Sequence, residues 1–210
     1  MQPSFAMSMP NSRQRGRQPL TLFEAFTVLT FACFAKADMD VVVLEVGMGG
    51  EWDCTNVADG QVAVIAPIDL DHTQFLGPTI EAIAKNKTGI IKADAFVVSS
   101  EQVREARAPI EEAVQRTHST VAFDGEDFGV DSVQPTQTGQ RVTLRGIAGT
   151  YENIDLPLLG VHQAHNAALA VAAVEAFPTA GKAPLPRDVV ARGIGEAQAR
   201  AGCRLSLAIP

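Results

Sequence analysis

Short apolar runs alternate with stretches of helical spacing through the first half of the chain. The runs VVVLEV, VAVIA and FVVS are apolar at nearly every position, which is typical of strands covered on both faces of a sheet. The pattern predicts strands over residues 41–46, 62–66, 96–99 and 120–123, and helices over residues 20–37, 79–87 and 101–117. Strands that alternate with helices indicate βαβ units, so we expect an α/β fold with a mostly parallel sheet flanked by helices.

The second half of the chain has a different pattern. Two stretches alternate polar and apolar residues and are joined through glycines, which predicts a small antiparallel β segment. An alanine-rich stretch without an internal breaker predicts a long helix, and Pro186 suits the first turn of another. These elements are expected over residues 140–145 and 151–156 for the strands, and 160–177 and 188–199 for the helices.

Composition and charge exclude several classes of protein. Of the 210 residues, 46% are hydrophobic and 20% are charged, which is ordinary for a globular protein. The net charge of −7 and the lack of a basic stripe argue against a nucleic-acid partner. The longest apolar stretch, 22–35, is too short for a bilayer, which needs about 20 residues. We therefore expect a buried helix there and no contact with a membrane.

Cysteine usage and the first residues of the chain bear on its location. The three cysteines are an odd number without CxxC spacing, which favours reduced thiols and a cytoplasmic protein. Residues 1–19 are basic and polar and lack the apolar centre of a secretory signal. We expect a disordered leader there rather than a targeting segment.

Glu45 is the first candidate for a functional side chain. It ends the apolar run 41–46, where a carboxylate is costly unless it is paired, hydrogen-bonded or bound to a metal. Gly47, Gly49 and Gly50 follow, and glycines allow the backbone to come close to a ligand. A salt bridge at the sheet edge is the structural alternative, but the glycines favour a metal or phosphate site.

His72 and Lys87 follow in the next strand–helix unit. His72 comes just after the strand 62–66, and strand ends of a parallel sheet converge on one crevice, so we expect His72 to lie close to Glu45. With no His/Cys cluster of zinc spacing, a magnesium-type site with few protein ligands is favoured over a structural histidine. Lys87 by itself is only a lysine near a helix end, favourably placed against the dipole.

The start of the alanine-rich helix is a further candidate. Residues 162–166 read HQAHN, and polar side chains with free amides at a helix start hold nucleotides or anions as readily as they cap the helix. Both interpretations stay open on the residues alone. Gly181-Lys182-Ala183 is not a phosphate-binding loop, because Ala183 replaces the required Ser or Thr.

Three blocks of the sequence match motifs of one enzyme family. Residues 45–57 read EVGMGGEWDCTNV, residues 70–92 read LDHTQFLGPTIEAIAKNKTGIIK, and residues 159–170 read LGVHQAHNAALA. Upstream, residues 19–24 read PLTLFE. From about residue 19 to residue 204 the chain resembles the bifunctional dihydrofolate synthase/folylpolyglutamate synthases of the Mur ligase superfamily.

The resemblance implies an ATP-dependent ligase of folate biosynthesis that joins L-glutamate to dihydropteroate or a folate through an acyl phosphate. It implies that Glu45 and His72 ligate a first Mg²⁺, and that Lys87 is carbamylated by CO₂, ligates a second Mg²⁺ and points into the same crevice. The residues implied to line the pteroate pocket are Thr21, Leu22, Phe23, Glu24, Trp52, Asp53 and Cys54. Asn166 and Arg204 are implied to contact ATP. The implied partners are small molecules, and intact members are mostly monomeric.

The chain departs from the family pattern at both ends. A basic leader stands where the family has a glycine-rich phosphate loop, and no Asp-Gly-Ala-His-Asn-Pro segment occurs. The motif that carries the ATP-contacting arginine is interrupted as Gly202-Cys203-Arg204. We expect a disordered leader (1–19), an incomplete Mur-type central domain (20–204) and a tail outside the family pattern (205–210). We also expect the isolated chain to be inactive.

Two other interpretations stay open. A Mur-type ligase that acts on cell-wall precursors would share the fold, although the segment 52–56 favours the folate branch. A non-catalytic remnant or binding module that keeps the fold is the other. An ATPase assay with and without dihydropteroate separates an enzyme from such a remnant.

Overall fold

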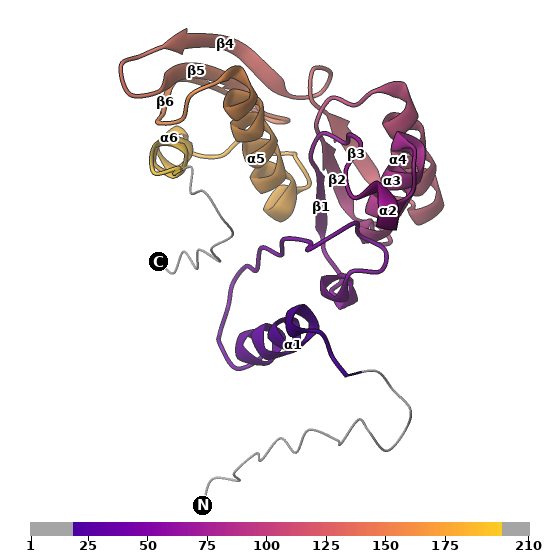
Figure 1. Ribbon diagram of the computed structural model, residues 1–210. Coiled ribbons are helices and arrows are strands. Elements are labelled where there is room, and N and C mark those ends of the chain that lie inside the picture. The colour runs from indigo at the N-terminus through magenta and orange to yellow at the C-terminus, as the bar shows by residue number, and fades with distance from the viewer. Residues whose placement is uncertain (1–18, 199–210) are drawn as a thin grey trace, which may run out of the picture. The chain divides into compact units, whose positions relative to one another are not determined.

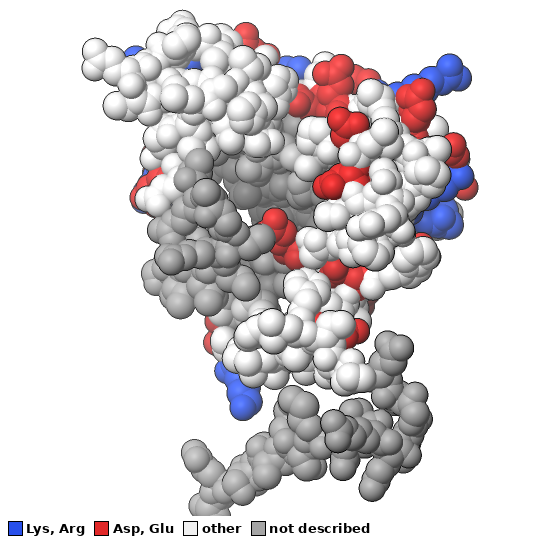
Figure 2. Space-filling model, in the orientation of Figure 1, with Lys and Arg blue, Asp and Glu red and all other residues white. Residues whose placement is uncertain are grey.

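The computed structural model describes residues 19–198, which fall into two compact units divided after Val46 (Figure 1). No helix within these residues is long and apolar enough to cross a membrane. The face drawn in Figure 2 carries scattered acidic side chains and, among the residues described, no continuous basic patch.

Helix α1 (Leu22–Phe34) is the regular element of the first unit. It begins with a capping box: Thr21 Oγ1 accepts a hydrogen bond from Glu24 N at 3.2 Å, and the Glu24 carboxylate accepts one from Thr21 N at 2.7 Å. The helix is confirmed, but the expected burial is wrong: Thr27 is its one buried residue, and Leu22 is 75% exposed. Residues 19–46, the described part of this unit, contain no second helix or strand that could cover the apolar side chains.

Residues 41–46, expected to form a buried strand, belong to neither sheet in the described part of the chain. Val43 is 87% exposed, and Glu45 is exposed as well. The expectation is wrong for this structure. A strand forms only where a neighbour takes up its backbone N–H and C=O groups, and within residues 19–198 no segment pairs with this run.

Three parallel strands form the first sheet of the second unit, in the order β1-β2-β3. They are β1 (Val62–Ile65), β2 (Phe96–Ser99) and β3 (Thr120–Phe123), as the sequence pattern predicted. Their register places the last residue of each strand at one edge of the sheet. The chain therefore leaves the sheet three times at this carboxyl edge, where functional groups of parallel sheets gather.

Helices cover both faces of the parallel sheet (Figure 1). Val97 packs in one apolar cluster with α3 (Ile80–Lys87) and α4 (Arg104–Thr117), whereas Val98 packs in another with α5 (Val161–Thr179). Successive side chains of a strand point to opposite faces, so these two fully buried valines show that β2 is covered on both sides. The continuous apolar runs predicted this arrangement.

A second, antiparallel sheet consists of β4 (Gly129–Pro135), β5 (Gln140–Arg145) and β6 (Thr150–Leu156). Strands β5 and β6 match the expected antiparallel segment, but β4 has no counterpart in the sequence analysis. Its residues GVDSVQP lack a clear apolar face and end in proline, which is tolerated here because β4 pairs only with β5. The last helix, α6 (Arg187–Gly195), contacts β6 and ends before residue 199.

Three short elements escaped the sequence analysis. They are η2 (Cys54–Val57), α2 (Thr73–Leu76) and η3 (Thr88–Ile90), where η denotes a 3₁₀-helix. Each is a single turn, too short to show helical periodicity. All three occur within the sequence blocks that carry the family resemblance.

Candidate functional site

Hydrogen bonds hold the segments that follow the strands in place at the carboxyl edge of the parallel sheet. Gln102 joins two of the connecting segments: its Nε2 donates to Ala66 O at 3.0 Å, and its Oε1 accepts from Ile68 N at 3.0 Å. Ser100 N donates to Ile65 O at 2.9 Å, so the segments leaving β1 and β2 stay paired beyond the strand ends.

His72 follows β1 and starts α2. Its φ of 48° and ψ of 34° are left-handed, a region in which His is found more often than most residues. Its side chain does not cap the helix, and Nε2 lies 3.6 Å from Asp71 Oδ2. Both side chains are more than half exposed. The His72 imidazole therefore lies beside a carboxylate and is exposed enough to contact a ligand.

Lys87 is the last residue of α3 and is half-buried. Its ammonium makes no hydrogen bond or ion pair with the residues that the structure describes. Lys85, two residues earlier, is exposed and pairs with Glu81 at 2.8 Å, and the hydrogen bond to Glu81 raises the pKa of Lys85. Of the two lysines at this helix end, Lys87 is thus the one whose amine is left for other chemistry.

The glycine-rich segment after residue 46 packs against the end of α3. A Cβ at Gly49 would lie 2.1 Å from Asn86 Oδ1, and one at Gly50 would lie 2.7 Å from Lys87 O. Glu51 N donates to Asn86 O at 2.9 Å. Glycine is needed at both positions for this close approach of protein segments. The approach of a ligand to these glycines stays a prediction.

Asp53 shapes the short segment that presents Trp52 and Cys54. Its Oδ1 accepts hydrogen bonds from Thr55 N at 2.9 Å and Thr55 Oγ1 at 2.6 Å, and its Oδ2 accepts one from Met48 N at 3.0 Å. Trp52 itself is 77% exposed. The Asp53 carboxylate is therefore occupied in folding the segment, whereas the indole is presented to solvent.

The remaining predicted site residues of the N-terminal part lie in the first unit. Thr21 and Glu24 form the capping box of α1, and the hydrogen bond from Thr21 N is the main cause that lowers the pKa of Glu24. Leu22 and Phe23 between them are exposed. Glu45 also belongs to this unit whereas His72 belongs to the second, so the closeness of those two side chains stays a prediction.

An Asp–His pair that the sequence analysis missed lies at the carboxyl edge. Asp124 follows β3 directly and is buried, and its Oδ2 lies 2.7 Å from His165 Nδ1 on α5. Asp124 Oδ1 has no hydrogen-bond partner in the part of the chain that the structure describes. The rule that singled out His72, a polar residue just after a strand, is the signal that would have found Asp124.

Asn166 follows His165 on α5 and is exposed, with Nδ2 reaching Gln163 Oε1 at a long 3.4 Å. The contact of His165 with Asp124 places the start of α5 at the carboxyl edge. Asn166 therefore shares an edge with the groups that follow the strands. Arg204 lies outside the described residues.

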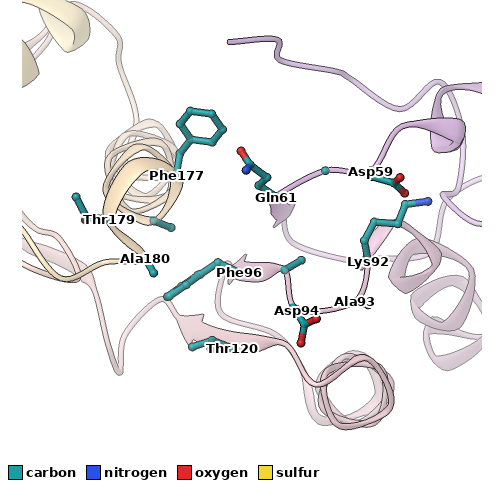
Figure 3. A pocket seen from close by; sticks show the side chains of 13 residues that line it. Asp59, Gln61, Lys92, Ala93, Asp94, Phe96, Thr120, Phe177, Thr179 and Ala180 are labelled. Carbon is teal, nitrogen blue, oxygen red and sulfur yellow. The ribbon is translucent and has the colours of Figure 1, made fainter. Parts of the chain in front are cut away.

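A hollow of about 750 Å³ opens at the opposite, amino edge of the parallel sheet (Figure 3). It is lined by the beginnings of the strands, among them Phe96 and Thr120, and by the end of α5 with Phe177 and Ala180. None of the predicted site residues lines it. We therefore place the candidate site at the carboxyl edge and not in this hollow.

Residues 19–198 hold no group of three or more His, Cys, Asp and Glu side chains arranged to hold a metal ion.

The sequence profile of the Mur ligase middle domain matches residues 8–174. The chain belongs to the Mur ligase family. This Mur ligase domain is 43% identical over 189 residues to the dihydrofolate synthase/folylpolyglutamate synthase of Mycobacterium tuberculosis, a match that covers 87% of the chain and 39% of that enzyme. It is 35% identical to the folylpolyglutamate synthase of Lacticaseibacillus casei, over 83% of the chain and 41% of that enzyme. The chain thus spans about two-fifths of the length of these relatives.

Solved structures confirm the fold. The M. tuberculosis folylpolyglutamate synthase complexed with ADP matches with a TM-score of 0.81 at 42% identity, over 86% of this chain and 40% of the other. A complex of folylpolyglutamate synthase with AMPPCP and folate matches with a TM-score of 0.82 at 34% identity, over 87% and 45%. The parallel sheet flanked by helices, with a separate antiparallel sheet, is the arrangement shared with these neighbours.

Proposed function

We propose that this Mur ligase domain is the nucleotide- and pteroate-binding part of a dihydrofolate synthase/folylpolyglutamate synthase, which joins L-glutamate to dihydropteroate or a folate. The observation that carries the proposal is the 43% identity, over nearly the whole chain, to an enzyme of that name. The neighbours solved with ADP, and with AMPPCP and folate, support a nucleotide and a folate as ligands.

The proposed reaction activates a carboxylate and then transfers it to an amine. A carboxylate oxygen of the pteroate attacks the γ-phosphorus of ATP, and the bond from that phosphorus to the β,γ-bridging oxygen breaks, which leaves an acyl phosphate and ADP. The glutamate amine attacks the acyl carbon and loses a proton as inorganic phosphate departs. Positioning of the reactants and neutralisation of phosphate charge carry most of such catalysis.

Two Mg²⁺ ions suit the donors that this chain offers. Glu45 and His72 would hold the first and a carbamylated Lys87 the second; Mg²⁺ binds few protein groups and completes its shell with phosphate oxygens and water. When bound, Mg²⁺ neutralises phosphate charge. Carbamylation joins the neutral lysine amine to CO₂ with loss of a proton, and Lys87 suits it because its amine is not held in an ion pair by the described residues.

The other roles follow the same proposal. Trp52 offers an exposed aromatic face to the pterin or benzoyl ring, together with Cys54 and the segment 21–24, and Asn166 and Arg204 would contact the nucleotide. Exposed aromatic surface on a rigidly folded loop is typical of binding sites. We propose a cytoplasmic monomer that takes small molecules rather than nucleic acid or membrane as partners.

Trp52 is the single tryptophan of the chain, so its fluorescence reports on this segment alone. We expect pteroic acid to quench it saturably. In calorimetry Trp52→Ala should weaken pteroic acid binding about tenfold, since loss of ring stacking and buried area costs roughly 1.4 kcal/mol or more. Val174→Ala, which truncates a half-exposed apolar side chain on α5, is the control and should bind as the wild type does.

The alternatives give other results in the same titration. Binding of a UDP-linked muropeptide in place of pteroic acid would indicate a cell-wall ligase. Binding of neither compound, nor of AMPPCP, would indicate a remnant that keeps only the fold.

A further inference from the structure

Asn56 joins the segment that carries Trp52 to the end of helix α3. Both hydrogens of its side-chain amide are used: Nδ2 donates to Glu51 O at 3.2 Å and to Gly89 O at 3.1 Å. The first acceptor lies in its own segment, and the second comes two residues after Lys87. One side chain therefore bridges two parts of the chain that are 33 positions apart in sequence.

Two further contacts hold the same junction. Lys92 Nζ donates to Asn56 O at 2.7 Å, so the residue is held through its backbone as well as its side chain. Gly89 comes so close to Glu51 that a Cβ on the glycine would lie 2.4 Å from Glu51 Cα. Backbones packed at such distances move together, and the segment 51–57 and the end of α3 form one body.

The second hydrogen bond of Asn56 goes beyond what its own turn requires. The segment already folds on Asp53, which accepts hydrogen bonds from Met48 N, Thr55 N and Thr55 Oγ1. The bond to Gly89 O adds nothing to that turn and instead anchors it beside Lys87. Truncation of Asn56 therefore removes the side-chain part of this anchor and leaves the Asp53 bonds and the bond from Lys92 Nζ to Asn56 O in place.

We propose that Asn56 is a positioning residue that fixes Trp52 relative to Lys87. The inference rests on the proposed function, because the pteroate role of Trp52 and the carbamylation of Lys87 come from it. A ligand that binds the exposed indole of Trp52 shifts the segment 51–57 and, through the contacts above, the backbone around Lys87. Pteroate binding therefore changes the reactivity of the Lys87 amine. The Asn56 amide carries part of this coupling, alongside the Lys92 bond and the packing of Gly89 against Glu51.

The test compares Asn56→Ala with Gln140→Ala in the full 210-residue chain. Gln140 is the matched control, because its Nε2 also donates to two carbonyls, Leu158 O at 2.7 Å and Gly160 O at 3.0 Å, beside the antiparallel sheet. Each protein is treated with an amine-acylating reagent, with and without pteroic acid, and mass spectrometry gives the labelling rate of Lys87. Fluorescence of Trp52 measures pteroic acid binding independently.

In the wild type and in Gln140→Ala we expect pteroic acid to change the labelling rate of Lys87 by about fivefold, which corresponds to a modest coupling between sites. In Asn56→Ala pteroic acid should still quench Trp52, but the labelling rate of Lys87 should respond clearly less than in the wild type. An undiminished response in Asn56→Ala would overturn the inference. An equal loss of response in Gln140→Ala would also overturn it, because that result would show a nonspecific loss of rigidity in the protein and not an effect of the Asn56 contacts.

Failure of the proposed function gives a different result. If pteroic acid does not quench Trp52 in the wild type, the pteroate assignment is wrong, and amide hydrogen exchange then decides the positioning role. Glu51 N donates to Asn86 O across the same junction, so weakening of the junction in Asn56→Ala should speed exchange at Glu51 N about tenfold. Exchange at Thr55 N, which donates to Asp53, should stay unchanged. Unchanged exchange at Glu51 N would overturn the positioning role as well.

Discussion

Tyr151→Phe tests the buried polar network that joins α5 to the antiparallel sheet. Glu175 on α5 is fully buried and accepts hydrogen bonds from Tyr151 Oη at 2.5 Å, Ile147 N at 2.5 Å and Ala148 N at 3.1 Å. Tyr151 Oη in turn accepts one from Leu185 N at 2.8 Å. The network thus ties the long helix both to the turn between β5 and β6 and to the segment that precedes α6.

The expected loss in the free energy of unfolding follows from the two groups that lose a hydrogen-bond partner, the Glu175 carboxyl group and Leu185 N. The substitution removes one oxygen and almost no volume, so no cavity forms. The hydrogen bond from Tyr151 to the Glu175 carboxyl group is lost, and Leu185 N is left without its acceptor; each loss costs about 1–3 kcal/mol. Because both effects share one atom, we expect a total of about 2–4 kcal/mol. A chain of this size would lose roughly 4–16 °C in Tm.

Urea unfolding followed by far-ultraviolet circular dichroism measures this change. Glu152→Gln, at the exposed neighbouring position on β6, is the control and should stay within about 0.5 kcal/mol of the wild type. If Tyr151→Phe also stays within that range, the network does not stabilise the fold and the reasoning fails.

The same residue makes stability depend on pH. Burial, and then the hydrogen bond to Glu175, raises the pKa of Tyr151 from 10.0 to about 12. Because the pKa is higher in the folded state, this stabilisation is complete below pH 10 and is lost as pH rises through the folded value. The higher pKa in the folded state corresponds to about 2–3 kcal/mol. The gap in unfolding free energy between wild type and Tyr151→Phe should therefore shrink by about that amount over this pH range. Tyr151 is the single tyrosine, so tyrosinate absorbance reports it alone, and titration near pH 10 in the folded chain would contradict the assignment.

Four further outcomes are expected. Gly89→Ala should destabilise the chain by about 1–3 kcal/mol in urea unfolding, because its Cβ would collide with Glu51. Gly193→Ala, with open space around its Cβ in α6, should instead stabilise by about 0.5–1 kcal/mol, and equal effects of the two would contradict the packing. Asp53→Ala should cost about 1–2 kcal/mol in the same assay, since a capping carboxylate is lost; an unchanged midpoint would exclude this role. The purified 210-residue chain, given ATP, Mg²⁺, bicarbonate, dihydropteroate and glutamate, should form no product above the no-enzyme control. No segment of it matches a phosphate-binding loop, and even one lost transition-state contact costs about 10²–10³ in rate. Product formation would reveal a phosphate site elsewhere in the chain.

The sequence by itself determined the parallel strands, the longer helices and the family. Three parallel strands formed from the runs at 62–65, 96–99 and 120–123. Such strands carry apolar side chains on both faces, and these side chains are buried only when a layer covers each face of the sheet. The first two runs are each followed by helical spacing, which specified the parallel connections of the sheet. The motif blocks specified the family because they combine many residue types at fixed spacing.

Only the tertiary structure decided burial and pairing. The runs 22–35 and 41–46 are as apolar as the true core, yet α1 buries only Thr27 and the second run has no strand partner among the described residues. The hydrophobicity of a segment gives the free energy that it would gain by burial against a neighbour. It does not show whether such a neighbour is present. The contact between Asp124 and His165 was likewise decided by the tertiary structure. The two residues are 41 positions apart in the sequence and meet only because α5 begins beside the end of β3.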